Sequence, residues 1–208
     1  MTPDSELRRY ATGHIRLVRY ADDYVPLFER RADAEEMQAA MVERLAKFGL
    51  QLHEAKTRLI EFGRFADVNR RRRGERRPET FDFLGFTHYC GKSREGRFRL
   101  VQKTQRKRMM RRLKELRQEL RCRMHSPVRD QQKWLRSVLI GHYAYFGIPG
   151  NSAGIADFLN EATKAWIATL RRRGQRPKLP WERVNSVLLQ VFPLPPALIR
   201  GWMQPLVA

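Results

Sequence analysis

Residues 14–30, HIRLVRYADDYVPLFER, decide the fold of the first third of the chain. Two short runs rich in apolar residues, His14–Tyr20 and Tyr24–Arg30, flank the central Ala21-Asp22-Asp23. This arrangement predicts a β-hairpin with both acids in its turn. Adjacent carboxylates repel each other unless a cation lies beside them, so the turn is a candidate cation site. The alternative is an ordinary solvated turn, because Asp is a common turn residue.

The rest of the first half alternates between helical and extended patterns. Apolar residues spaced by 4, 4 and 3 positions predict an amphipathic helix over Ala34–Phe48, and Gly49 ends it. Three further elements are predicted downstream: a strand over Arg58–Phe62, an exposed loop over Arg70–Arg77, and a hairpin from Phe83–Cys90 to Arg97–Val101.

After Val101 the apolar spacing becomes that of helices. Four helices are predicted, one from about Lys103 to Met124, one from Ser126-Pro127 to Phe146, one over Ile155–Leu170, and one from about Trp181. The predicted fold class is therefore α+β, with a mixed first part over residues 1–101 and a helical second part over residues 102–208.

Charge divides the chain differently from hydrophobicity. Its 208 residues carry a formal net charge of +20. Residues 1–66 hold 11 basic and 11 acidic side chains, whereas residues 67–125 hold 20 and 7. A basic segment beside a neutral one that carries paired acids suggests a nucleic-acid-binding surface next to a metal or catalytic element.

No apolar run approaches the ~18–20 residues of a membrane span, and the N-terminus has no apolar signal-peptide core. We therefore expect no membrane partner and a cytoplasmic location.

Three motifs in order resemble a known enzyme family. Tyr20-Ala21-Asp22-Asp23 between two apolar strands resembles the catalytic hairpin of reverse transcriptases. The segments Phe48–Arg58 (FGLQLHEAKTR) and Phe83–Phe86 (FLGF) look like the next two blocks of that family. The remainder resembles the maturase, or thumb, region of the proteins encoded by group II introns, which are mobile elements. The segments that carry this second resemblance are Leu120–Pro127, Gly141–Tyr143, Tyr145–Phe146, Pro149–Asn151, Trp166, Arg171–Gln175 and Trp181–Arg183.

The resemblance implies a domain division and a chemistry. Residues 1–101 would be the C-terminal part of a reverse-transcriptase palm, and residues 102–208 a helical thumb or maturase domain. Asp22 would be the catalytic metal ligand and Asp23 its acidic neighbour. In the complete enzyme they would hold two Mg²⁺ ions for nucleotidyl transfer, with substrate phosphates completing the coordination.

The resemblance also implies contacts with the primer and the nucleotide. Tyr20 and Ala21 would lie near the primer end, and Lys56 would approach the nucleotide or the primer-template backbone. Phe83, Leu84 and Gly85 would belong to the primer grip. From the residues alone, Lys56 is equally a solvated strand-edge lysine, and Phe83 is more typical of a core.

The basic segments suggest phosphate contacts that do not depend on base sequence. The residues expected to make them are Arg70, Arg71, Arg72, Arg73, Lys103, Lys107, Arg111, Arg171, Arg172 and Arg173. A merely solvated charged face is the alternative. We favour the grip because a net charge of +13 over residues 67–125 repels itself unless an anion relieves it. Tyr143, Tyr145 and Phe146 are candidates for stacking on bases, although the position of Phe146 near an apolar stripe is more typical of a core residue.

The sequence departs from the family before the YADD motif. Family enzymes carry fingers and a further metal-binding aspartate there, whereas 19 residues precede Tyr20 in this chain. We therefore expect no polymerisation by the chain alone, and its status as an enzyme stays open. Three hypotheses remain: part of a reverse transcriptase, a non-catalytic RNA-binding maturase-like module, or a poorly folded gene remnant. Expected partners are group II intron RNA, primer-template nucleic acid, and a complementing N-terminal fragment or a second copy.

Overall fold

The computed structural model describes residues 12–21, 23–53, 57–173 and 187–199. The chain divides into two compact units, one ending at Glu79 and the other starting at Thr80. The predicted boundary between palm and thumb at residues 101 and 102 concerns family segments and stays a prediction. None of the helices in the described part of the chain has the length and apolar character needed to cross a membrane.

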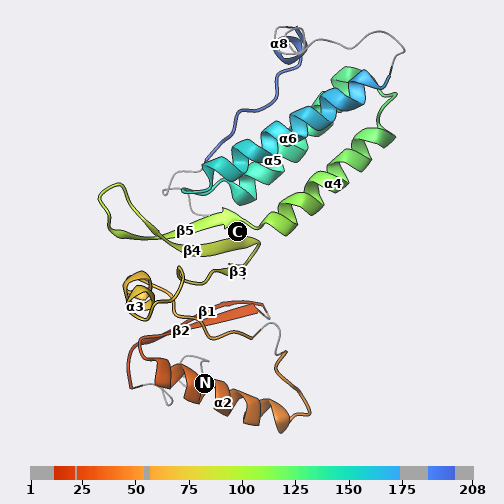
Figure 1. Cartoon of the computed structure of the whole chain (residues 1–208). Helices are drawn as coiled ribbons and strands as arrows, with labels where there is room; N and C mark the ends of the chain where they lie inside the picture. Colours follow the sequence, from red (N-terminus) through yellow and green to blue (C-terminus); the bar gives the residue numbers. More distant parts are fainter. Residues whose placement is uncertain (1–11, 22, 54–56, 174–186, 200–208) are drawn as a thin grey trace. The chain divides into compact units, whose positions relative to one another are not determined.

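The first unit is built on the predicted hairpin (Figure 1). Strands β1 (Ile15–Tyr20) and β2 (Asp23–Phe28) pair antiparallel, with Tyr20 opposite Asp23 at the closed end. Asp23 is therefore the first residue of β2, and residues 21 and 22 alone connect the strands. Ala21 has a φ of 51°, the left-handed conformation that tight hairpin turns require.

Helix α2 (Arg31–Ala46) follows directly and begins three residues before the predicted start. The side chain of Asp33, in its first turn, is buried and accepts hydrogen bonds from the backbone N–H of Thr12 at 3.1 Å and of Gly13 at 3.0 Å. These bonds join the start of the helix to the segment before β1. The bond from Gly13 is the main reason that the pKa of Asp33 is lowered.

Two predictions for the end of this unit are wrong. Residues 57–62 form no strand, and the predicted loop over Arg70–Arg77 begins inside helix α3 (Ala66–Arg72). Arginine is a good helix former, and acidic side chains around this segment neutralise its charge. The arginines can therefore be part of a helix, because their mutual repulsion is reduced.

The second unit begins with a three-stranded antiparallel sheet. Its strands are β3 (Phe81–Phe83), β4 (Phe86–Lys92) and β5 (Phe98–Thr104), in that order. The β4–β5 hairpin confirms the prediction, although β4 starts later, because Phe83 belongs to a short additional strand. Leu84 and Gly85 form the connection between β3 and β4, with φ values of 49° and 78°.

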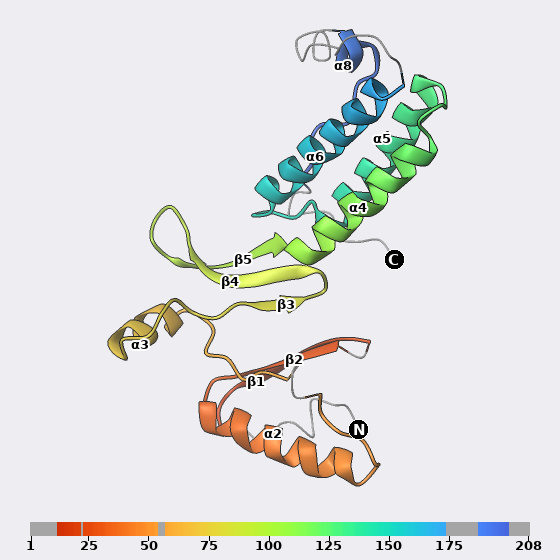
Figure 2. The same ribbon diagram turned by 45° about the vertical axis from the view of Figure 1, so that its right-hand side comes forward.

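Three long helices follow and lie side by side in both views (Figures 1 and 2). They are α4 (Arg106–Cys122), α5 (Val128–Phe146) and α6 (Ser152–Arg171). The first three predicted helices are thus confirmed. The helix predicted from Trp181 starts outside the described residues, and the short α8 (Leu189–Val191) follows them.

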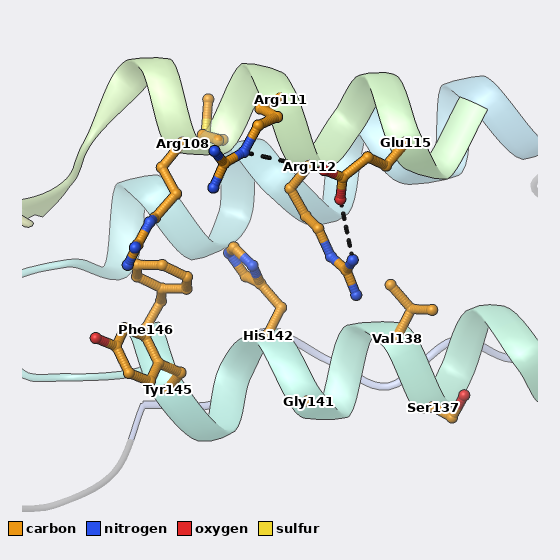
Figure 3. A pocket seen from close by; sticks show the side chains of 11 residues that line it. Arg108, Arg111, Arg112, Glu115, Ser137, Val138, Gly141, His142, Tyr145 and Phe146 are labelled. Atoms are coloured by element: carbon orange, nitrogen blue, oxygen red, sulfur yellow. Dashed lines mark hydrogen bonds and ion pairs between the residues drawn. The ribbon is translucent and has the colours of Figure 1, made fainter. Parts of the chain in front are cut away.

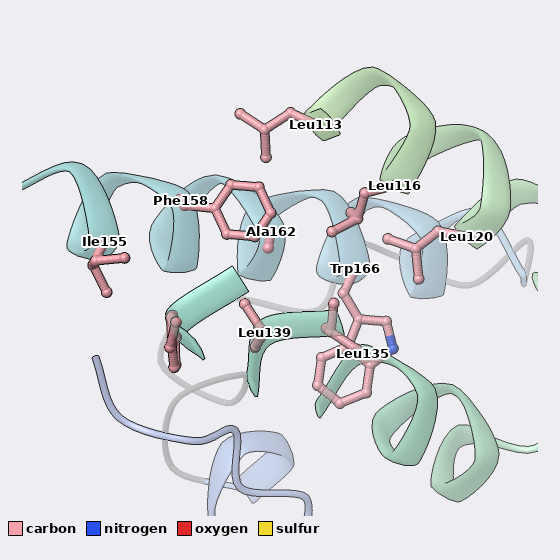
Figure 4. Packing of buried hydrophobic residues seen from close by; sticks show 10 residues of the cluster. Leu113, Leu116, Leu120, Leu135, Leu139, Ile155, Phe158, Ala162 and Trp166 are labelled. Carbon is pink, nitrogen blue, oxygen red and sulfur yellow. The ribbon is translucent and has the colours of Figure 1, made fainter. Parts of the chain in front are cut away.

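The core of the second unit lies between these helices (Figure 4). Leucines of α4 and α5 close around Phe158, Ala162 and Trp166 of α6. Gln131 is fully buried among them and accepts a hydrogen bond from Trp166 Nε1 at 3.0 Å. Its amide nitrogen donates to Arg123 O at 2.7 Å, which ties the α4–α5 connection to α6.

The first unit has no comparable core among its described residues. Its buried apolar side chains are Ala34, Met37 and Ala66, whereas Val18 and Tyr20 of the hairpin are exposed. The sheet there has two strands, and a lone two-stranded hairpin is only marginally stable in water.

Candidate metal-binding hairpin and nucleic-acid interface

The closed end of the β1–β2 hairpin brings together Tyr20, Ala21 and Asp23. Arg19 Nε, in β1, donates a hydrogen bond to Ala21 O at 3.0 Å and so links the strand to the turn. The Tyr20 side chain is exposed, as is that of Asp23 directly opposite it. Asp22 lies outside the described residues.

Asp23 is suited to hold a hard cation. Its exposed carboxylate forms no hydrogen bond or ion pair with the residues that the structure describes, so both oxygens are available. Carboxylate oxygens are the protein ligands that Mg²⁺ prefers. Within the described part of the chain, no three His, Cys, Asp or Glu side chains gather as a metal-binding group. An ion here would therefore need Asp22 and oxygens from a bound substrate besides Asp23.

Lys56 also lies outside the described residues, but the predicted primer-grip turn is well defined. Leu84 O accepts a hydrogen bond from Tyr145 Oη at 2.8 Å, and Gly85 O accepts one from Gln105 N at 2.9 Å. A Cβ on Gly85 would collide with the guanidinium of Arg108. Helices α4 and α5 thus fix the position of this turn. Sequence reasoning did not identify Arg108 or the bond from Tyr145.

Phe83 is the last residue of β3, directly before this turn. Its ring is half-buried and lies 6.4 Å from the ring of His88. Phe86, at the start of β4, is buried, and its ring stacks on Tyr145 at 5.9 Å. Both phenylalanines therefore pack within the unit, as the residue pattern alone favoured.

The arginines of α3 are largely engaged with acids of their own unit. Arg70 forms ion pairs with Glu75 at 3.3 Å and Glu79 at 3.8 Å, and Arg71 pairs with Asp67 at 3.2 Å. Arg72 alone of the four has no ion-pair partner among the described residues.

Arg73 is the centre of the network. It bonds Glu61 and also Glu75, the latter at 2.6 Å. Its hydrogen bonds are the main cause of the lowered pKa of both carboxyl groups, and they raise the pKa of Arg73 in return.

The other predicted phosphate contacts do not form one patch. Lys103, at the end of β5, lies 5.5 Å above the ring of Tyr89, and Lys107 is exposed in the first turn of α4. Arg171, Arg172 and Arg173 lie at the C-terminal end of α6, where Arg173 donates to Ser126 O beyond the other end of α4. Helix α4 has 17 residues and is about 25 Å long, so the two groups lie that far apart.

A groove of about 400 Å³ runs between α4 and α5 (Figure 3). Arginines of α4 line one wall, and Val138, Gly141, His142 and Tyr145 of α5 line the other. Tyr143 faces elsewhere: it is buried, and its hydroxyl donates to Pro195 O at 3.3 Å. The expectation that Tyr143 stacks on bases is therefore wrong, because the ring belongs to the core.

His142 is buried beneath this groove and stacks on Phe158, with ring centroids 3.7 Å apart. Burial, with a smaller effect of the nearby Arg112 charge, lowers its pKa to about 4. The imidazole is therefore neutral at neutral pH. Its ring packs within the helical unit against Phe158.

One family model matches a segment of the sequence that includes both the hairpin and the turn. Residues 3–88 match the family model described as reverse transcriptase (RNA-dependent DNA polymerase). The matched segment includes the acid-bearing hairpin, the arginine network and the Leu84–Gly85 turn. No curated protein sequence matches the chain. The family match supports the assignment of residues 3–88 as a fragment of a reverse transcriptase.

Proposed function

We propose that the chain is part of a group II intron RNA-directed DNA polymerase that also acts as a maturase in splicing of its intron RNA. The single observation that carries this proposal is the reverse-transcriptase match over residues 3–88, with the exposed Asp23 inside it. The motifs quoted from the second half of the sequence supply the group II intron and maturase part. A cytoplasmic location stays a prediction from the sequence.

In this proposal Asp22 and Asp23 hold Mg²⁺ at the connection between β1 and β2. The ions would activate the primer hydroxyl and neutralise the leaving pyrophosphate. Tyr20 and Ala21 would lie next to the primer end because they are close to Asp23 at the closed end of the hairpin. The Phe83–Gly85 turn would contact the primer, and the helices that fix its position would keep it rigid.

The proposal includes a partner for the first unit. Exposed Val18 and Leu27 on a two-stranded sheet favour a further polypeptide segment that pairs with the hairpin and covers its apolar side chains. A complementing fragment that brings another metal-binding aspartate would then complete the ion site. A second copy of the chain is the other candidate partner.

Primer extension tests the enzymatic part. The purified chain, given Mg²⁺, a primer and an RNA template, should bind the primer-template without extending it. Template-dependent synthesis above background by the chain alone would contradict the need for a partner. With a complementing fragment present, Asp22→Ala should abolish synthesis and leave primer-template affinity unchanged. Loss of binding in that variant would show that Asp22 has another role.

A non-catalytic RNA-binding module is the second candidate. The helical unit has a well-packed hydrophobic core, whereas the first unit, which carries Asp23, has few buried apolar residues. This contrast favours a function that depends on the helical unit. Splicing of a group II intron transcript at low Mg²⁺ distinguishes the two. Stimulation that persists in Asp22→Ala, with no synthesis under any condition, would favour the module.

A further inference from the structure

The groove between α4 and α5 has a charged wall that its own acids do not neutralise. Arg108 and Arg112 project from α4 toward α5, and Arg111 lines the same wall (Figure 3). Glu115 pairs with Arg111 at 3.9 Å and with Arg112 at 3.1 Å, so one carboxylate serves two guanidinium groups. Arg108 has no ion-pair partner among the described residues. The wall therefore keeps a net positive charge that suits an anion such as a phosphate.

The opposite wall is apolar and partly aromatic. Val138, Gly141 and Tyr145 lie on one face of α5, at the spacing of successive helical turns. The Tyr145 side chain is 50% exposed, although its ring stacks on Phe86 and its hydroxyl is bonded to Leu84 O. These contacts, with an edge-on contact to the Phe146 ring at 4.7 Å, hold the Tyr145 ring in a fixed orientation. A planar ligand that stacks on it would lose little additional side-chain entropy.

Gly141 keeps the groove open. A Cβ built on this residue meets nothing within 4 Å, so the space above it is unfilled. Below it, His142 Nε2 is buried without a hydrogen-bond partner in the described part of the chain. The groove thus combines cationic and aromatic groups around an open space.

We propose that this groove binds one unpaired nucleotide of a single-stranded RNA or DNA segment. Arg108 and Arg112 contact its phosphates, and the base lies against Tyr145 and the surface above Gly141. A base within a duplex is already stacked and paired, so it cannot enter such a groove. The inference rests on the proposed function, because it assigns single-stranded nucleic acid as a ligand of the helical unit. It adds a preference for single-stranded over double-stranded nucleic acid, which phosphate contacts alone do not give.

The test measures binding of the full chain to fluorescently labelled probes by anisotropy. The probes are a single-stranded RNA of about twelve nucleotides and a blunt duplex of the same length. Gly141→Leu fills the groove from a position where the added side chain has room. Arg108→Ala removes the unpaired guanidinium. Arg136→Ala, an exposed arginine of α5 outside the groove, is the matched control for loss of one charge.

We expect Gly141→Leu to weaken single-strand binding on the order of tenfold, the effect of losing one stacked base, and to leave duplex binding unchanged. Arg108→Ala should weaken single-strand binding more than Arg136→Ala does. Each variant's circular dichroism spectrum and thermal melt establish that it is folded. Should Gly141→Leu fail to fold, Gly141→Ser provides a smaller obstruction with the same expected direction.

Three outcomes would overturn the inference. Unchanged single-strand binding in Gly141→Leu would show that the groove is not used. An equal loss for both probes would show contacts with phosphates only. Gly141-dependent binding of an aspartate-rich peptide, without such dependence for RNA, would assign the groove to a protein partner. If the wild-type chain binds neither nucleic acid, the proposed function fails together with this inference, whereas binding that ignores the groove variants overturns the inference alone.

Discussion

The buried His142 makes the stability of the helical unit depend on pH in a direction that can be worked out. Its pKa is about 4 in the folded chain, against 6.5 for an ordinary histidine. Between these values the unfolded chain binds a proton that the folded chain does not. The free energy of unfolding therefore falls as the pH falls through this range. The difference between the two pKa values lowers the free energy of unfolding by at most about 3 kcal/mol. About 2 kcal/mol of this decrease is reached at pH 5.

Replacing His142 removes this dependence. His142→Phe keeps a planar ring between Phe146 and Phe158, whose centroids lie 4.7 Å and 3.7 Å from that of the imidazole. His142→Gln keeps a polar side chain that does not titrate. In both variants the free energy of unfolding should fall about 2 kcal/mol less than in wild type between pH 7 and pH 5.

Urea denaturation followed by tryptophan fluorescence measures the effect, because all four tryptophans lie in the second unit. Some pH dependence should remain in both variants, since burial also lowers the pKa of His88. The lowered pKa of Glu161, caused mainly by Lys164, contributes only at still lower pH. Identical slopes for wild type and both variants between pH 7 and pH 5 would refute the reasoning, because His142 would then titrate alike in the folded and unfolded chain.

Three further predictions concern single contacts. Gln131→Leu removes the acceptor of Trp166 Nε1 and the donor to Arg123 O, so it should lower the free energy of unfolding by about 1–3 kcal/mol in urea titrations; no change would mean that water replaces both bonds. Leu84→Asn places a residue that tolerates left-handed backbone at φ 49°, so it should raise the free energy of unfolding by about 0.5–1 kcal/mol and the melting temperature with it; a lower melting temperature would show that packing of Leu84 matters more. Arg73→Ala should speed hydrogen exchange of the α3 amides, whereas Arg72→Ala should not, because Arg73 bonds Glu61 and Glu75 and Arg72 has no ion-pair partner among the described residues; equal rates would show that the network does not hold α3 in place.

The hairpin and the three long helices could be predicted because their apolar residues repeat at the spacing of the element. In β1 and β2 a short polar connection between two apolar runs was enough, and the structure differs only in placing Asp23 in the strand. In α4 the spacing of Leu113, Leu116 and Leu120 matches the buried stripe that contacts α6.

Helix α3 was missed because it has almost no apolar stripe. Ala66 is its only buried residue, so periodicity carries no signal there. The available signal was electrostatic: Asp67 and Arg71 are four residues apart, the spacing at which opposite charges stabilise a helix. Strand β3 was missed for another reason, since three residues are too few to show alternation.

The groove could not be predicted because its walls come from helices separated in the sequence. Arg108 and Arg112 repeat on α4, and Val138 and Tyr145 on α5, but each set alone reads as an ordinary helix face. Only the packing of both helices against α6 brings the two faces opposite each other. The residues of such a groove come together only in the tertiary structure, so the sequence pattern of either helix alone does not indicate it.

The structure also changes what the net charge of +20 means. Arg70, Arg71 and Arg73, which formed the most basic run of the sequence, pair with acids of the first unit. These pairs lower the net charge of the segment, but exposed ion pairs are weak, so phosphate contacts by Arg71 and Arg73 stay a prediction. Arg108 has no ion-pair partner among the described residues, and it lies in the basic run Arg106-Lys107-Arg108. We therefore expect phosphate binding to depend on the position of an arginine relative to the acids of its own unit as well as on the density of arginines along the sequence.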